Sequence, residues 1–302
     1  MFQGIKCVVH GADHIAKNKI CQDAAGFLTR DNYAAAVVAD GHGGEKYIRS
    51  DIGSKMAVQS AIETIETYMK DFEKFSRKIG GNYEYILKKM QEQFLARWSV
   101  GIEAYHKEHP LTKKETGILA REHMAEKDIY VMYGSTVLIA VMSEKFYYGM
   151  LVGDGGFVVV EQDGNVNIPI EDERSYANYC SSICSQNAID AFRSFYREGI
   201  PLSISVSTDG LIKSFDNEED FKKYHVLITS MLSNIENCTT SLNKNLNKRT
   251  CDGSGDDISI AVIFNTDTFN TDTVEQQNNI KSKRRRRKDA CEGKCNTGKM
   301  QG

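Results

Sequence analysis

Four aspartates stand at the ends of apolar, strand-like runs, each beside a glycine. Carboxylates that meet at the edge of a sheet repel one another unless a cation neutralises them. Groups of carboxylate oxygens suit Mg²⁺ or Mn²⁺. An isolated Asp-Gly pair is more often a turn, and we expect only turns at 163–164 and 252–253. We interpret the four as a candidate centre for divalent cations: Asp40, Asp154, Asp209 and Asp256.

A histidine follows the first of these aspartates in the segment ADGHGG, residues 39–44. An imidazole titrates near working pH, so His42 is a candidate general acid for a poor leaving group. The alternative is a structural histidine in a glycine turn. No Cys-x5-Arg arrangement occurs in the chain, which disfavours a covalent cysteine mechanism and favours direct attack by water.

The elements that must position these residues are mostly strands. Period-2 and continuous apolar patterns predict strands at 5–10, 23–29, 33–39, 135–142, 146–153, 157–162, 203–207 and 258–264. The three strands of 135–162 are expected to form an antiparallel meander. Apolar residues at helical spacing predict helices over 44–69 and 84–107, joined by a connection at 70–82, and one or two helices over 217–247. Residues 171–198 are expected to be partly helical and partly loop.

The bulk composition indicates a protein with a sizeable core. The chain has 302 residues, of which 41% are hydrophobic. No run approaches the roughly 18 apolar residues of a membrane helix, and no secretory signal is recognisable at the N-terminus. The eight cysteines are scattered without zinc-knuckle spacing. We therefore expect a cytoplasmic protein with free thiols and no membrane span.

Charge divides the chain into two unlike parts. Residues 281–302 contain nine Lys/Arg and two Asp/Glu, whereas 1–280 contains 29 and 39. The acidic body favours cation binding over nucleic-acid binding. The basic run KSKRRRRK (281–288) is expected to be a solvated, disordered tail, with an acidic partner as the alternative. It has no interleaved aromatics, so nucleic acid is disfavoured.

Five motifs occur in one order over most of the chain: VADGHGG, GSTVLIAV, LVGDGG, STDG and GDDISIAVIF. Together they resemble the metal-dependent type-2C serine/threonine protein phosphatases, and the N-terminal GADHIAKNKICQDAAG resembles a bacterial branch of that family. The resemblance implies an α+β fold in which two antiparallel sheets form a sandwich with helices on both outer faces, in α-β-β-α layers. It implies a catalytic domain over 1–266 and leaves 267–302 as the tail.

The resemblance also implies roles for individual residues. Asp40 would bridge two Mn²⁺ or Mg²⁺ ions, and the Gly41 carbonyl would bind one of them. A water between the ions would attack phosphorus, with His42 as general acid. Asp209 and Asp256 would bind the other metal. Asp23 would act through metal-bound water, and Asp154 would belong to a weaker third metal position. Asp257 is the runner-up for the role of Asp256.

The sequence departs from the animal enzymes of that family in three places. Gln22 stands where they have an acidic residue, and Asn18 where they have an arginine that holds the substrate phosphate. Glycines 155–156 replace a common serine and arginine. Candidate replacements for the phosphate-binding arginine are Lys17, Lys19 and His14, although a lysine lacks arginine's two-pronged fork.

Three functions are compatible with these residues. The first is metal-dependent hydrolysis of phosphoserine and phosphothreonine in a phosphoprotein substrate. The second is a catalytically silent relative that binds phosphoproteins as a scaffold. The third is hydrolysis of small phosphate esters at the same centre. Retention of Asp40, His42, Asp209 and Asp256 favours an enzyme, and the missing arginine slightly favours the silent relative.

Overall fold

The computed structural model describes residues 1–124, 129–170 and 181–269. Contacts divide the chain into a unit of Met1–Asn265 and a unit of Thr266–Gly302. In the second unit the described part contains one short 3-10 helix, η4 (Thr266–Thr268). The basic run predicted to be a disordered tail lies outside the described residues.

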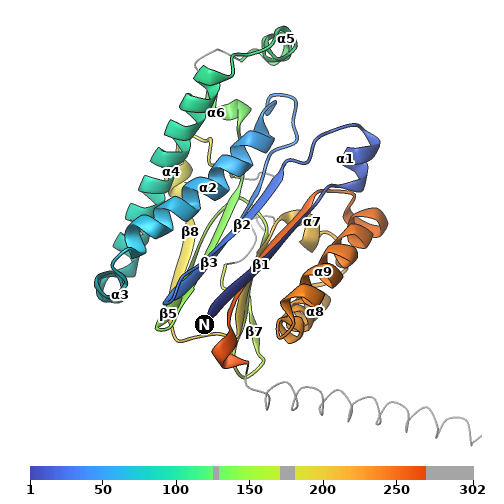
Figure 1. Ribbon diagram of the computed structural model, residues 1–302. Helices are drawn as coiled ribbons and strands as arrows, with labels where there is room; N and C mark the ends of the chain where they lie inside the picture. Colours follow the sequence, from blue (N-terminus) through green and yellow to red (C-terminus); the bar gives the residue numbers. More distant parts are fainter. Residues whose placement is uncertain (125–128, 171–180, 270–302) are drawn as a thin grey trace, which may run out of the picture. The chain divides into compact units, whose positions relative to one another are not determined.

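Two five-stranded antiparallel sheets form the centre of the first unit (Figure 1). The strand orders are β1-β10-β9-β6-β7 and β2-β3-β4-β5-β8. The strands are β1 Phe2–Val9, β2 Asp23–Thr29, β3 Tyr33–Asp40, β4 Val137–Ser143, β5 Phe146–Val152, β6 Gly156–Val160, β7 Val166–Asn167, β8 Arg193–Glu198, β9 Ser203–Ser207 and β10 Ile258–Asn265.

The alternation of side chains in β3 shows how the sheets are covered on both faces. Ala34, Ala36 and Val38 lie in the core between the two sheets. Their neighbours Val37 and Ala39 point the other way and pack in the core beneath the helices. A strand that is buried on both faces has no polar side, and this explains the continuous apolar run at this position.

Helices cover the outer face of each sheet (Figure 1). The α2 and α4 helices pack on the sheet that contains β3, through residues such as Ile65 and Trp98, and α8 and α9 pack over β6 and β1. This arrangement confirms the predicted α-β-β-α sandwich. The helices are α1 Ala12–Ala16, α2 Ser50–Met69, α3 Phe72–Gly81, α4 Tyr83–Glu108, α5 Lys113–Arg121, α6 Ile129–Met132, α7 Asp209–Ile212, α8 Glu218–Met231 and α9 Ile235–Arg249. None of them is long and apolar enough to cross a bilayer.

The predicted meander over 135–162 is wrong in its last step. The β4 and β5 strands pair as a hairpin, but β6 leaves this sheet and pairs with β9 and β7 of the other one. The chain makes this change at Gly153 and Gly155, whose φ angles are +94° and +132°. These backbone conformations favour glycine because a Cβ would clash. The connection between them carries Asp154 from one sheet to the other.

Three other segments differ from the expectation. The connection predicted at 70–82 contains α3, and residues 44–49 form turns before α2 begins at Ser50. In the segment expected to be helix and loop at 171–198, residues 171–180 lie outside the described residues, and the rest contains a short 3-10 helix, Ala188–Ala191, and ends in β8, which pairs with β5. The side chains of β8 are all half-buried or exposed, so its sequence lacks the apolar run of a buried strand.

Arg49 anchors the connection between α4 and α5. This buried side chain donates hydrogen bonds to both carboxylate oxygens of Glu115 at 2.8 and 3.2 Å, and to the carbonyl of His109 at 2.7 Å. Glu115 also completes a capping box with Thr112 at the start of α5. Hydrogen bonding from Arg49 is the main reason that the pKa of Glu115 falls to about 2.

We predict that Glu115→Gln lowers the stability of the fold by about 1–3 kcal/mol at pH 7. Because the folded-state pKa of Glu115 is lowered, its contribution is fully present above the ordinary value of 4.5 and is lost as the pH falls towards about 2. The difference in melting temperature between the two proteins should therefore shrink between pH 5 and 2. Glu73→Gln, which removes an exposed ion pair with Lys145, is the matched control. A gap that does not depend on pH would contradict the assignment.

Candidate metal centre

The predicted aspartates lie at the same end of the sandwich because of how the strands pair. Asp23 begins β2 and lies directly opposite Asp40, the last residue of β3. Asp209 follows β9 and begins α7, and Asp256 lies just before β10. The β9 and β10 strands are neighbours in the same sheet. Asp154 lies in the connection that crosses from β5 to β6. Both sheets and the crossover thus contribute carboxylates to one site.

Strand pairing and chain connections place these carboxylates at one end of the sandwich, and their charges act on one another. The pKa of Asp40 is raised well above its ordinary value, first by burial and then by the charges of Asp23, Asp209, Asp256 and Asp154. Burial also raises the pKa of Asp209 to about 6, with a further contribution from Asp154. Three of the five side chains, Asp23, Asp154 and Asp209, are buried. Carboxylates gathered in this way fit a hard divalent cation with oxygen ligands.

Lys213 is a residue of the site that the sequence analysis missed. It lies one helical turn after Asp209, and its Nζ is 2.6 Å from Asp209 Oδ2 and 3.0 Å from Asp256 Oδ2. The ammonium thus bridges two of the predicted metal ligands. The sequence contained a signal for this contact, since a lysine four residues after an aspartate in a helix faces it. That signal is very common on helix surfaces and therefore did not single out Lys213.

Gly41 occupies a position with no room for a side chain. A Cβ there would lie 2.6 Å from the carbonyl oxygen of Ser50 and 2.7 Å from that of Gln22. The Gly41 N–H donates to the Gln22 carbonyl at 3.1 Å, which fixes the peptide that follows Asp40. The backbone is therefore held closely at the position where the sequence analysis places a carbonyl ligand.

His42 is half-buried, and its backbone is held from two sides. Its N–H donates to the Gly134 carbonyl at 3.1 Å, and its carbonyl accepts from Ser50 Oγ and Gln22 Nε2, both at 2.9 Å. Gln22, which lacks the acidic group of the animal enzymes, thus acts as a brace for this loop. Burial lowers the pKa of the His42 imidazole to about 4, and the charge of Asp154 opposes that change.

The structure gives Asp256 and Asp257 different environments. Asp257 is 3% exposed, and its two carboxylate oxygens accept backbone N–H groups of Gly11 at 2.6 Å and Gln22 at 2.7 Å. Asp256 has a side chain that is 30% exposed, and it contacts Lys213. Asp256 therefore lies among the cluster's carboxylates, whereas Asp257 ties the N-terminal segment to the start of β10.

The two lysines predicted to hold the substrate phosphate lie in different surroundings. Lys17 is exposed and pairs with Asp13 at 2.9 Å on the surface of α1. Lys19 lines a cleft of about 500 Å³ beside the glycines of the His42 loop; other residues that line it are Gln22, Gly43, Tyr47 and Lys114. Lys46 is a further lysine of this region, which the sequence did not single out. Its charge lowers the pKa of His42, so its ammonium lies near that ring.

We predict that Asp257→Asn destabilises the fold by about 1–3 kcal/mol, because an amide can accept only one of the two backbone N–H groups and turns its own NH₂ towards the other. Urea unfolding monitored by circular dichroism measures this cost. Asp256→Asn is the matched variant and should change stability by no more than about 0.5 kcal/mol, since its side chain is partly exposed. Equal costs for the two variants would contradict the distinction between them.

Comparisons with known proteins agree with this architecture. A family model described as protein phosphatase 2C matches residues 10–248, which include every predicted site residue except Asp256. A bacterial serine phosphatase structure has a TM-score of 0.57 and 14% identity, with 87% of this chain and 98% of that chain covered.

Two further solved structures are similar at 14% identity. Stp1, a serine/threonine phosphatase from Staphylococcus aureus, has a TM-score of 0.53 and coverages of 88% and 95%. The catalytic domain of the serine/threonine protein phosphatase PstP, in complex with two manganese ions, has a TM-score of 0.52 and coverages of 87% and 97%. The comparison with curated protein sequences found no significant match to this chain. Since the family model matches most of the chain, this protein belongs to the protein phosphatase 2C family.

Proposed function

We propose that this chain hydrolyses phosphoserine and phosphothreonine in proteins with the help of divalent cations held by its aspartate cluster. The observation that carries the proposal is the convergence of Asp40, Asp209 and Asp256 from both sheets at one end of the sandwich. Membership of the protein phosphatase 2C family gives this cluster its reaction class. The PstP structure with two manganese ions supports Mn²⁺ as the cation, and Mg²⁺ takes the same kind of oxygen ligands.

The proposed ligands are those that the family resemblance implies. Asp40, on which the charges of the other four aspartates act, would hold the cations together with the carbonyl of Gly41. Asp209 and Asp256, which share Lys213, would also hold a cation. Asp23 is almost completely buried behind Asp40 and accepts a hydrogen bond from Thr208, which suits an indirect role. Asp154 is assigned to a weaker third position.

The chain's own residues then position and protonate the substrate. When bound, the two cations supply an activated water and neutralise charge on the phosphoryl oxygens. His42 is proposed to give a proton to the leaving serine or threonine oxygen. A phosphate ester beside the ring adds negative charge, which acts in the same direction as Asp154 and against the effect of burial on the pKa of His42.

Recognition of the phosphoprotein is assigned to the cleft next to His42. Lys19 lines this cleft and Lys46 lies close to the His42 ring, so both can bring positive charge to the phosphate. Lys17 remains a proposed contributor, but its partner Asp13 competes for its charge.

The proposal also includes a cytoplasmic location and an acidic partner for the basic run 281–288.

A catalytically silent, phosphoprotein-binding relative is the second candidate function. The contact that favours it is Lys213, whose ammonium already neutralises Asp209 and Asp256. A protein with a permanent internal cation has less need of a metal at that position. The absence of an arginine at Asn18 points the same way.

We predict that Lys213→Met binds Mn²⁺ about fivefold more tightly than the wild type. The metal then displaces no ammonium, and two partly exposed ion pairs are together worth about 1 kcal/mol. The variant should also melt at a lower temperature in EDTA, because its carboxylates have lost a neutralising partner. Isothermal titration and thermal unfolding with and without EDTA measure both effects. Lys223→Met, which removes an exposed lysine of α8, is the control; an unchanged affinity for Mn²⁺ in Lys213→Met would show that Lys213 does not compete with the metal.

We predict metal-dependent turnover of a phosphothreonine peptide, lost by more than about 100-fold in Asp209→Asn. His42→Ala should lose about 10²–10⁴-fold on the peptide. It should lose much less on p-nitrophenyl phosphate, whose leaving group needs no proton. Assays with Mn²⁺, Mg²⁺ or EDTA measure these rates.

Asp31→Asn is the control for that assay, because it lies in the turn at the opposite end of β2 and β3. A folded wild-type protein without turnover in any metal would refute the enzyme. Binding of the phosphopeptide by that inactive protein would establish the silent relative. Turnover of p-nitrophenyl phosphate without turnover of the peptide would assign the centre to small esters.

A further inference from the structure

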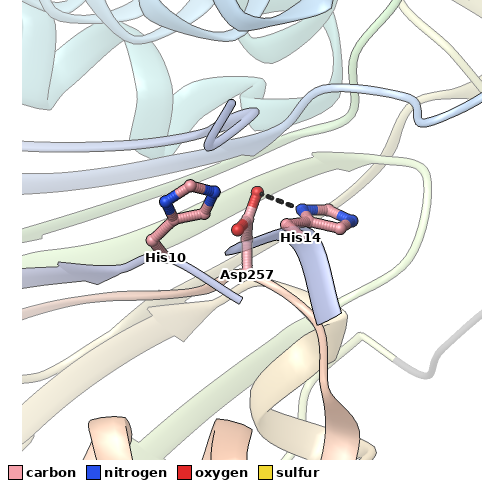
Figure 2. A group of neighbouring side chains, drawn as sticks. All are labelled: His10, His14 and Asp257. Atoms are coloured by element: carbon pink, nitrogen blue, oxygen red, sulfur yellow. Dashed lines mark ion pairs between the residues drawn. The ribbon is translucent and has the colours of Figure 1, made fainter. Parts of the chain in front are cut away.

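A second group of side chains that could bind a metal lies next to the aspartate cluster. His10 follows β1, His14 lies in α1, and Asp257 precedes β10. One potential ligand atom from each lies within 4.8 Å of the other two. Figure 2 shows the carboxylate of Asp257 between the two imidazole rings. The three residues come from two segments that are far apart in the sequence.

One imidazole of this group has a buried nitrogen atom without a partner. Within the described part of the chain, His10 Nε2 makes no hydrogen bond. His14 Nδ1 makes no well-aligned hydrogen bond either, but it lies 3.0 Å from Asp257 Oδ2, which is an ion-pair distance. Buried polar atoms without partners are rare because leaving them so costs free energy, and a metal ion is one recognised explanation. An unpartnered imidazole nitrogen beside a carboxylate and a second imidazole therefore points to a ligand.

Asp257 can serve such a ligand in spite of its two backbone hydrogen bonds. Each of its oxygens accepts one N–H group, from Gly11 or Gln22. A carboxylate has about four lone-pair sites, so each oxygen keeps one. The 3.0 Å between His14 Nδ1 and Asp257 Oδ2 is close to the roughly 3.3 Å that separates two tetrahedral ligands 2.0–2.1 Å from zinc. Small side-chain movements would bring the third donor into range.

We infer that His10, His14 and Asp257 form a zinc site that adjoins the aspartate cluster. Asp257 is the neighbour of Asp256, and His14 Nε2 lies 3.7 Å from Asp256 Oδ1. Two imidazoles and one carboxylate are a donor set for Zn²⁺, whereas oxygen ligands alone suit Mg²⁺ and Mn²⁺. Three protein ligands leave a fourth position open. The two sites therefore select different ions by the chemistry of their donors.

Cys21 is a candidate for the fourth position. It is a free thiol of intermediate burial whose sulfur interacts with Asp257, although it is not among the three ligand atoms that lie within 4.8 Å of one another. A bound cation favours the thiolate of a coordinating cysteine. The zinc site can thus be closed by sulfur or left open to water.

The position of the zinc site gives it a structural consequence. It joins the segment that begins at His10 to the loop that carries Asp256 and Asp257. That N-terminal segment continues through Lys19, which lines the cleft, to Asp23 at the start of β2. Zinc at this point would therefore stabilise both the wall of the cleft and the backbone next to the aspartate cluster.

Zinc titration of the full, metal-free chain tests the inference. The background is Asp40→Asn with Asp209→Asn, which removes ligands of the aspartate cluster. We expect this protein to keep one equivalent of tightly bound Zn²⁺ by isothermal titration. Adding His10→Gln and His14→Gln should weaken zinc binding by at least tenfold, whereas adding His109→Gln, an exposed histidine that faces Tyr105, should not change it. Circular dichroism confirms that each variant is folded.

Cobalt supplies a second readout that does not depend on affinity. Co²⁺ bound to the same background should show the intense visible absorption of tetrahedral coordination, and Cys21→Ser should remove any thiolate charge-transfer band. Loss of zinc binding in the aspartate background, or equal zinc affinity after the histidine substitutions, would overturn the inference. In that case His14 is simply the counter-ion of Asp256 and Asp257, at 3.7 and 3.0 Å. Because these readouts involve no turnover, they are independent of the proposed phosphatase activity.

Discussion

Electrostatic repulsion among the clustered carboxylates is the constraint that the rest of this structure must satisfy. Asp40 experiences the charges of four other aspartates in surroundings where water cannot screen them well. Such a cluster persists only if the backbone on every side is held firmly and positive charge is at hand. The pairing of β2 with β3 and the bonds from Gln22 to the His42 loop supply the rigidity. Lys213 supplies part of the charge.

The sequence was most informative where the pattern was strictly local. Asp40 was predicted correctly as the end of a strand because the apolar run of β3 stops abruptly there, whereas Asp209, also predicted at the end of a strand, begins α7 after β9 ends at Ser207. The sandwich itself followed from the order of motifs and their resemblance to a known family. By contrast, α3 was missed because its charged, amphipathic sequence lies between two more apolar helices. Its buried face, Phe72, Phe75 and Ile79, has helical spacing, but the glycine pair at 80–81 favoured a break, whereas α3 extends through both glycines.

Features that depend on contacts between distant segments could not be predicted. The sequence shows β5 and β6 as neighbours, and only the positive φ angles around Asp154 explain why they enter different sheets. Asp256 and Asp257 are adjacent and chemically alike, yet one faces the cluster and the other binds backbone N–H groups more than 230 residues away along the chain. The same difficulty hid the imidazoles of His10 and His14, which come together with Asp257 only in the folded chain.

The crossover between the sheets has a mechanical consequence. Asp154 is carried by the step from β5 to β6, whereas Asp40 belongs to one sheet and Asp209 follows a strand of the other. The separation of these carboxylates therefore depends on the spacing of the two sheets, which is set by the interior side chains between them, such as Leu151 and Phe157. Close-packed interiors transmit a change in volume as a displacement. The proposed cation affinity would consequently be a property of the packing in the whole sandwich, and substitutions deep in its core would tune the site without touching any residue that surrounds it.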